Sequence, residues 1–295
     1  MSTQPDAFWL QTLAHRRAHG VMADLPAAVG RPQSSDEAFA LQQQFAAGYG
    51  EVIGWKCGVP GLTDAGLPKW VVAPLYQREL QQGAECALWP SVKGLARVEP
   101  EYAYPLLADL PAFTALSHAD APVSADLSTD KDQSDEHSFD HSAEHSVDQS
   151  ADLSHAAIDA LLGTPKLAFE LIQSRFAADA GAQFFDQLAD GLFNQGVWLG
   201  PTLSQGEHAE FPLTVMITDQ PPQQLAARHP NLAPRLPIYW LVNFLRRHGV
   251  ALKAGQHLIT GSFAGVIELP FNHGVQWQFG SEPAFSLVYR NKAEL

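Results

Sequence analysis

Apolar and polar positions repeat with helical spacing over the first fifty residues of the chain. Residues 6–20, DAFWLQTLAHRRAHG, are amphipathic and end at a glycine, and residues 34–50, SSDEAFALQQQFAAGYG, repeat this arrangement. Ser34 and Glu37 stand in the spacing of a capping box, a pattern that marks the start of a helix. We therefore predict two helices within residues 1–50, packed on a core that the rest of the chain forms.

From residue 51 the pattern changes to short apolar runs separated by glycine or proline. Enrichment of such runs in β-branched and aromatic residues is typical of strands. We predict strands within residues 51–61, 70–76, 84–90, 96–107, 166–174, 196–201, 211–218, 255–262, 265–271, 274–280 and 284–290. Residues 236–249, LPIYWLVNFLRRHG, predict one late helix that begins near Pro237 and ends at Gly249. The sequence thus predicts an α+β fold with a β-rich domain over residues 51–295.

Residues 111–157 do not share this pattern. Within them, residues 137–152 repeat a four-residue unit of His or Gln, Ser, any residue, and Asp or Glu. Such a segment has too little apolar surface to offset the entropy lost on ordering, so we expect a disordered insertion in a surface loop. His137, His141 and His145 are spaced to meet on one face of a transient helix and bind a metal ion, but a solvated acidic loop is the interpretation we prefer.

The charge of the chain is concentrated in this insertion. The net charge is −14, and residues 120–152 carry ten acidic residues and one lysine, which together account for −9. The remaining chain is mildly acidic, which argues against nucleic acid or an anionic membrane as a partner. The two cysteines form no CxxC pair, so we expect free thiols in a cytoplasmic protein. We find neither a signal-peptide pattern nor an apolar stretch long enough to span a membrane.

The segment GLARVEPEYAYPL, residues 94–106, places two glutamates on one face of a predicted strand. Strand alternation brings Glu99 and Glu101 together on the face that also carries Arg97. Two neighbouring carboxylates repel each other unless a positive group lies between them, and oxygen ligands favour a hard cation such as Mg²⁺ or Mn²⁺. Glu170, an acid inside an apolar strand pattern, is the best candidate for a third ligand. Two alternatives to a bound cation remain: Arg97 could neutralise the two glutamates, or the glutamates could lie on a solvated strand face.

Six segments occur in an order that resembles one enzyme family. They are GWKCG, PLY, RVEPEYAYPL, FELIQSR, LADGLFNQGVWLG and LKAGQHLITGS. This set is similar to the 2-keto-4-pentenoate hydratase and 4-oxalocrotonate decarboxylase family, within the fumarylacetoacetate hydrolase superfamily. The resemblance covers nearly the whole chain except residues 111–160. It implies a mixed, strongly curved β-roll core with N-terminal helices, and homo-oligomerisation.

The resemblance also implies roles for individual residues. Glu99, Glu101 and Glu170 would bind Mg²⁺ or Mn²⁺, and Lys56 would contact the substrate carboxylate or transfer a proton. An ordinary ion pair between Lys56 and one of the glutamates is the alternative. The residues expected to contact the substrate are Arg97, Asn194, Thr260, Gly261 and Ser262.

The chain departs from the family pattern beside the expected site. The family usually carries an acidic residue just before the segment that corresponds to Pro74–Leu75, whereas this chain has none there, and Asp64 lies too early to match. Gly191 stands where the family has asparagine, and Asn194 where it has serine. The missing acidic residue weakens the prediction of hydration without affecting the three predicted ligands.

We therefore predict a metal-dependent lyase, a hydratase or decarboxylase, that acts on a short 2-oxo acid or its 2-hydroxydienoate tautomer, as in aromatic-compound catabolism. The cation would stabilise the enolate that forms when such a substrate reacts. One alternative is a C–C bond hydrolase of the same superfamily, although that reaction requires a general base, typically a His–Glu pair, that we do not find in residues 10–50. The other is a catalytically inactive binding or assembly module.

Overall fold

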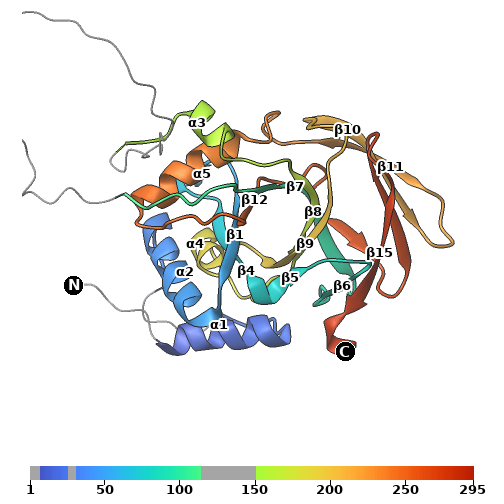
Figure 1. Cartoon of the computed structure of the whole chain (residues 1–295). Coiled ribbons are helices and arrows are strands. Elements are labelled where there is room, and N and C mark those ends of the chain that lie inside the picture. The colour runs from blue at the N-terminus through green and yellow to red at the C-terminus, as the bar shows by residue number, and fades with distance from the viewer. Residues whose placement is uncertain (1–6, 26–30, 114–150) are drawn as a thin grey trace, which may run out of the picture.

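The computed structural model describes residues 7–25, 31–113 and 151–295. A ring of strands occupies its centre, with helices on one side and a second sheet on the other (Figure 1). The helices are α1 (Ala7–His19), α2 (Ser35–Tyr49), α3 (His155–Asp159), α4 (Phe184–Ala189) and α5 (Leu236–Arg247), with short 3₁₀ turns at Gln77–Glu79 and Lys292–Glu294.

The larger sheet forms the ring. Its order is β4-β1-β12-β7-β8-β9-β5, with β13 also paired to β7. The bounds of these strands are β1 (Val52–Cys57), β4 (Val72–Tyr76), β5 (Leu80–Gln81), β7 (Ala96–Pro105), β8 (Lys166–Ile172), β9 (Asn194–Thr202), β12 (His257–Ile259) and β13 (Ile267–Leu269). The β1–β12 and β5–β9 pairs are parallel and the others antiparallel. Because β4 approaches β9, the sheet is almost closed into a roll.

The second sheet covers part of the outside of the roll. Its order is β11-β10-β14-β15-β6. Its strands are β6 (Glu85–Leu88), β10 (Glu210–Ile217), β11 (Gln223–Arg228), β14 (Gly274–Phe279) and β15 (Phe285–Asn291), and a separate hairpin pairs β2 (Gly61–Leu62) with β3 (Pro68–Lys69). Aromatic side chains fill the space between the two sheets, as where the ring of Phe169 on β8 lies 4.5 Å from that of Trp277 on β14.

Side-chain alternation gives the roll an apolar outside and a mixed inside. Inside the roll, a small buried cluster consists of Leu75, Ala103, Ala168, Val197, Leu199 and Ile259. Positions two apart on a strand share a face, so Glu101 faces inward with Ala103, and Glu170 faces inward with Ala168. The roll therefore encloses apolar residues and, further along the same strands, charged ones.

The helix predictions for the N-terminal region are confirmed. In α2 the hydroxyl of Ser34 accepts a hydrogen bond from the N–H of Glu37. The carboxylate of Glu37 accepts from the N–H of Gln33, one residue before the partner that a capping box expects. The late helix is confirmed as α5, with Pro237 in its first turn and Gly249 beyond its end at a φ of 75°.

The two described ends of the predicted insertion meet on α5. The buried guanidinium of Arg246 donates to the backbone carbonyls of Pro111 and Ala151. The backbone carbonyl of Arg246 accepts from the N–H of Phe113. Helix α3 (His155–Asp159) begins inside the range that the sequence assigns to the insertion and ends two residues beyond it. Residues 114–150, with the three spaced histidines, lie outside the described residues.

The predicted fold class is confirmed: an α+β protein with a mixed, strongly curved roll and helices at its N-terminal end. Among the described residues, none of the helices has the length and apolar character required to cross a membrane.

Candidate metal centre

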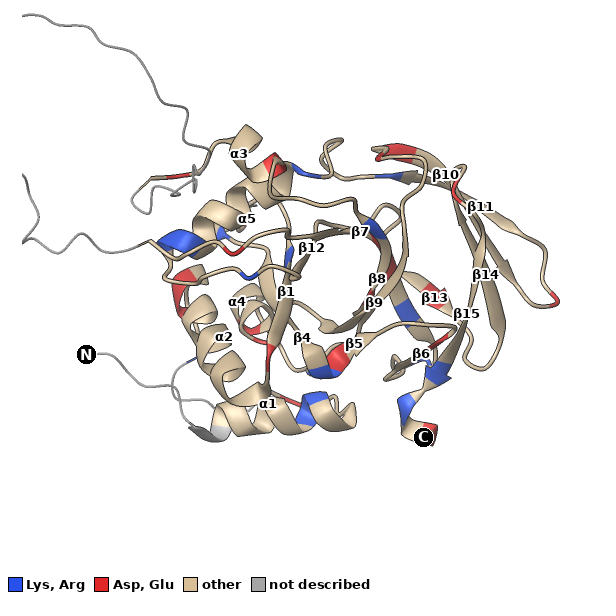
Figure 2. Ribbon diagram, viewed as in Figure 1, with Lys and Arg blue, Asp and Glu red and all other residues tan. Residues whose placement is uncertain are grey.

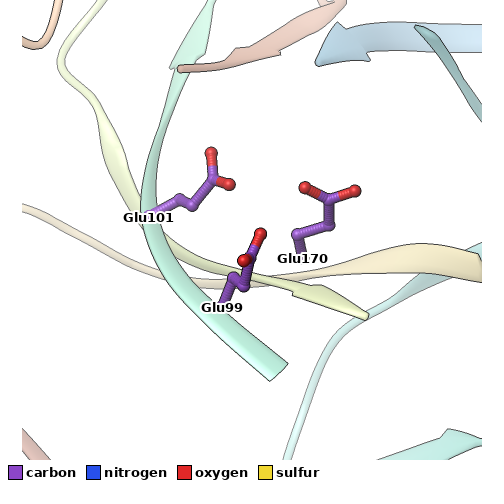
Figure 3. A group of neighbouring side chains, drawn as sticks. All are labelled: Glu99, Glu101 and Glu170. Carbon is purple, nitrogen blue, oxygen red and sulfur yellow. The ribbon is translucent and has the colours of Figure 1, made fainter. Parts of the chain in front are cut away.

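Three glutamates from two adjacent strands meet inside the roll. Glu99 on β7 is the direct register partner of Glu170 on β8, and Glu101 follows two positions along β7. One carboxylate oxygen of each lies within 4.8 Å of the others, and the three side chains point toward a common space (Figure 3). Glu101 and Glu170 are each 1% exposed, whereas Glu99 is half-buried at the mouth of the group. The structure thus brings together the three predicted ligands.

Glu170 is held by two donors to the same oxygen. The ammonium Nζ of Lys56, on β1, lies 2.6 Å from Oε1 of Glu170, and the amide of Asn194 donates to this oxygen at 2.9 Å. Lys56 also donates to the carbonyl of Leu192 at 3.1 Å. The acidic positions on β7 and β8 and the basic position on β1 can be followed in the ring of Figure 2. The predicted proximity of Lys56 to the glutamates is therefore present.

Glu101 is held by a backbone group. Its Oε2 accepts a hydrogen bond of 2.8 Å from the N–H of Gly261, in the turn that follows β12. Gly261 has a φ of 119°, a conformation that glycine adopts without strain and other residues rarely adopt. The turn is tied to β7 a second time, since the N–H of Phe263 donates to the carbonyl of Pro100.

Burial and the charges of neighbouring carboxylates raise the pKa values of Glu99 and Glu101. Loss of solvent, and next the charge of Glu170, raise the pKa of Glu99 from 4.5 to about 7. The same two causes, with the charge of Glu99 added, raise the pKa of Glu101 well above its ordinary value. Lys56 lowers the pKa values of both groups, and Arg97 lowers that of Glu99, but these positive charges do not offset burial and repulsion.

The donor set fits a hard divalent cation. Among the described residues, hydrogen-bond donors are found on Oε1 of Glu170 and Oε2 of Glu101 but on neither of the opposite oxygens. Each of these glutamates is therefore oriented by one oxygen and has the other available as a ligand. Three carboxylate oxygens without nitrogen or sulfur ligands are the chemistry that Mg²⁺ and Mn²⁺ prefer.

A pocket of about 300 Å³ opens beside the glutamates. Lys56, Thr260 and Gly261 line it with the three carboxylates, together with the apolar side chains of Val59 and Val71. Pro230 and Asn231, from the turn between β11 and α5, also line it and were not expected from the sequence. An isolated His-Pro-Asn segment carries a turn signal but nothing that assigns it to this pocket.

The other predicted substrate contacts lie further away. Asn194 is completely buried behind Glu170, and its Oδ1 accepts from Arg17 on α1 at 3.2 Å. Arg97 lines a neighbouring pocket of about 320 Å³ and has Glu268 on β13 as its ionic partner at 3.9 Å. The hydroxyl of Ser262 donates within its own turn to the carbonyl of Gly265. Their contact with a substrate stays a prediction.

The two departures from the family pattern can also be placed. Asp64 lies in the β2–β3 turn and lines a separate surface cleft, so among the described residues the glutamates are the acids that line the central pocket. Gly191 begins a run of left-handed backbone in which Leu192 and Phe193 have φ values of 52° and 68°. Such conformations cost energy in non-glycine residues and are common where a backbone group serves a site. Here the run presents the carbonyl of Leu192 to Lys56.

A buried ionic network supports the centre from outside the roll. Arg17 pairs with Glu79 through two hydrogen bonds of 2.8 Å, and the hydroxyl of Tyr49 donates to the same carboxylate. Through Asn194, Arg17 is connected to Glu170, so helix α1 reaches the metal centre.

Comparison with known proteins adds evidence on the fold. No protein-family model matches the chain. A search of curated proteins likewise finds no match. Among solved structures, 4-oxalocrotonate decarboxylase from Pseudomonas putida G7, complexed with calcium and acetate, matches with a TM-score of 0.60 at 12% identity, over 98% of this chain and 100% of that chain. The same enzyme complexed with magnesium and adipate matches over the same shares of both chains, with a TM-score of 0.59 at 11% identity.

At 11–12% sequence identity, these matches are evidence on the fold alone. The match extends over essentially the whole of both chains, including the N-terminal helices. The chain therefore has the fold of 4-oxalocrotonate decarboxylase, the fold that its sequence resemblance to the fumarylacetoacetate hydrolase superfamily implies.

Proposed function

We propose that this protein is a divalent-metal-dependent lyase that acts on a short 2-oxo acid or its 2-hydroxydienoate tautomer. The observation that carries the proposal is the meeting of Glu99, Glu101 and Glu170 within 4.8 Å, in a pocket that also holds Lys56. When bound, Mg²⁺ or Mn²⁺ supplies Lewis-acid stabilisation of the negative charge that develops on the substrate oxygens.

Charge balance favours an anionic substrate. When the three carboxylates are ionised to bind the cation, they and Lys56 carry a net charge of −2, which a divalent cation neutralises. A 2-oxo carboxylate then enters a pocket without net repulsion, and its two neighbouring oxygens suit chelation of one cation. The side chains of Val59 and Val71 add an apolar wall to the pocket.

Lys56 is the group that is placed to move a proton. Its ammonium has three N–H donors. Two of them are directed to Glu170 and Leu192. The third is available to a substrate oxygen or carbon in the pocket. A lysine held between a buried carboxylate and a carbonyl keeps a fixed position, which proton transfer requires.

Of the two lyase reactions, decarboxylation makes the smaller demand on this pocket. It breaks one C–C bond, releases CO₂ and leaves the electron pair on the substrate, which then takes up one proton. Hydration also requires activation of a water molecule, and among the described residues the acids that line the pocket are the three proposed ligands. The fold match with a decarboxylase supports the same choice. Hydration, and the hydrolase reaction of the same superfamily, remain distinguishable by their products.

Calorimetry with chelator-stripped protein tests the proposal. Titration with Mn²⁺ and Mg²⁺ is expected to give one site in the wild type and none in Glu101→Gln. Glu268→Gln, which changes an exposed glutamate on β13, is expected to keep wild-type affinity. Oxalate, an analogue of a 2-oxo acid enolate, is expected to bind when the metal is present and not without it. Incubation with 4-oxalocrotonate and with 2-hydroxydienoates then identifies the reaction by CO₂ release or by water addition. Absence of metal binding in the wild type would refute the proposal.

A further inference from the structure

A buried histidine contacts the backbone of the turn that holds Glu101. His229 follows the last residue of β11 and is completely buried. Its Nε2 lies 3.1 Å from the carbonyl oxygen of Thr260, and its Nδ1 accepts a hydrogen bond of 3.3 Å from the N–H of Asn231. A carbonyl only accepts, so Nε2 carries the proton, and the hydrogen bond from Asn231 fixes the same neutral tautomer.

The Thr260 carbonyl and the Gly261 N–H belong to a single peptide group. His229 donates to the oxygen of this peptide. The N–H of the same peptide, that of Gly261, donates to Oε2 of Glu101 at 2.8 Å. The rigid planarity of a peptide means that fixing the direction of the C=O fixes that of the N–H. A hydrogen bond to the oxygen also strengthens the one from the nitrogen.

We infer that His229 is a positioning residue for the metal ligand Glu101, and that it acts through the Thr260–Gly261 peptide. The inference rests on the proposed function, since it requires that Glu101 bind a cation. It assigns a role to a residue that touches neither the cation nor the pocket.

The surroundings of the peptide show why it needs an external partner. Gly261 has a φ of 119°, and the freedom that glycine gives the turn allows the peptide to rotate. Backbone hydrogen bonds hold the two turns that meet here. The N–H of Arg228 donates to the carbonyl of Phe263, and the N–H of His229 donates to the carbonyl of Ala209. Among the described residues, His229 is the side chain found within hydrogen-bond distance of the Thr260 carbonyl, and the Thr260 hydroxyl lies 3.4 Å from the same Nε2.

Replacement of His229 by residues that keep either its ring or its donor separates positioning from packing. His229→Phe keeps the ring, which lies edge-on to Phe263 at 5.3 Å, but loses the donor. His229→Gln loses the ring but has an amide that can reach the position of Nε2. We expect about tenfold weaker Mn²⁺ binding in the Phe variant and at most about a threefold change in the Gln variant, since outer partners of metal ligands contribute about 10- to 100-fold to affinity.

The measurement is calorimetric titration of chelator-stripped protein with Mn²⁺, with thermal unfolding to show that each variant is folded. His257→Phe is the matched control, because this half-buried histidine of β12 lies beside Lys166 and Gly255 and should leave Mn²⁺ affinity unchanged. If the Phe variant does not fold, His229→Asn takes its place, since its shorter amide cannot reach the Thr260 carbonyl.

Each outcome decides one of the two proposals. Weak binding in Phe or Asn and recovery in Gln supports the inference. Wild-type affinity in a folded Phe or Asn variant, or equal weakening in all variants, overturns it while the metal centre stands. Absence of Mn²⁺ binding in the wild type overturns the proposed function and this inference with it.

Discussion

Replacement of Glu99 by glutamine should stabilise the metal-free protein at alkaline pH. Glutamine keeps the shape of the carboxyl group and removes its charge. Burial and the charge of Glu170 raise the pKa of Glu99 from 4.5 to about 7. The folded state therefore holds a proton that the unfolded state releases, and the free energy of unfolding falls as pH rises from 4.5 to 7.

The size of the effect follows from the pKa difference. A change from 4.5 to about 7, at about 1.4 kcal/mol per pH unit, corresponds to about 3 kcal/mol once the group is fully ionised. Because Glu99 is half-buried, screening by water reduces this to about 2 kcal/mol. The gain in unfolding free energy from Glu99→Gln should therefore be about 2 kcal/mol larger at pH 8 than at pH 5.

Urea denaturation in the presence of a chelator measures this difference. Unfolding free energies of the wild type and Glu99→Gln are compared at pH 5 and pH 8. Glu268→Gln, which removes an exposed carboxylate paired with Lys93, should change stability by less than about 0.5 kcal/mol at either pH. Saturating Mn²⁺ should reverse the order of stability, because the wild type binds the metal more tightly. A pH-independent effect of Glu99→Gln, or destabilisation at pH 8, would refute this electrostatic reasoning.

Three further changes test other parts of the centre. Lys56→Met should lower turnover at least about 100-fold in steady-state kinetics, because it removes a proton donor. Calorimetry should show that Mn²⁺ binds at least as tightly as in the wild type, because a competing positive charge is removed. Asn194→Leu should weaken Mn²⁺ binding about tenfold in calorimetry, since Glu170 loses one of the two donors that orient it. Arg17→Met should lower the free energy of unfolding by about 3–5 kcal/mol in urea denaturation because it leaves Glu79 buried and unpaired, and Arg17→Met/Glu79→Leu should recover most of that loss.

Local signals were sufficient to predict most elements of the fold. The strands that glycine and proline separate all appear, because each buries at least one alternating apolar face. Strand β11 was missed because its sequence, QQLAAR, is largely exposed and lacks the apolar alternation of a half-buried strand. Helices α3 and α4 were missed because segments of five and six residues are too short to show a helical period.

The grouping of the three glutamates could be predicted for a different reason. Alternation alone places Glu99 and Glu101 on one face, and Glu170 stands out as an acid in an apolar strand. Their hydrogen-bond partners could not be predicted, because they depend on contacts between distant segments. His229 reaches Thr260 through the packing of the β11–α5 turn on the turn after β12, and no spacing in the sequence encodes that approach.

Helix α1 is connected to the group of glutamates through Arg17 and Asn194. The side-chain Nδ2 of Asn194 is directed to Glu170 because its Oδ1 accepts hydrogen bonds from the N–H of Gly196 and from Arg17. Without Arg17, one of these partners is lost, and the direction of the amide is less strongly determined. Arg17 in turn is kept in place by Glu79, which lies in the 3₁₀ turn between β4 and β5. Removal of helix α1 should therefore weaken metal binding as well as stability, even though every proposed ligand lies in the β-rich part of the chain.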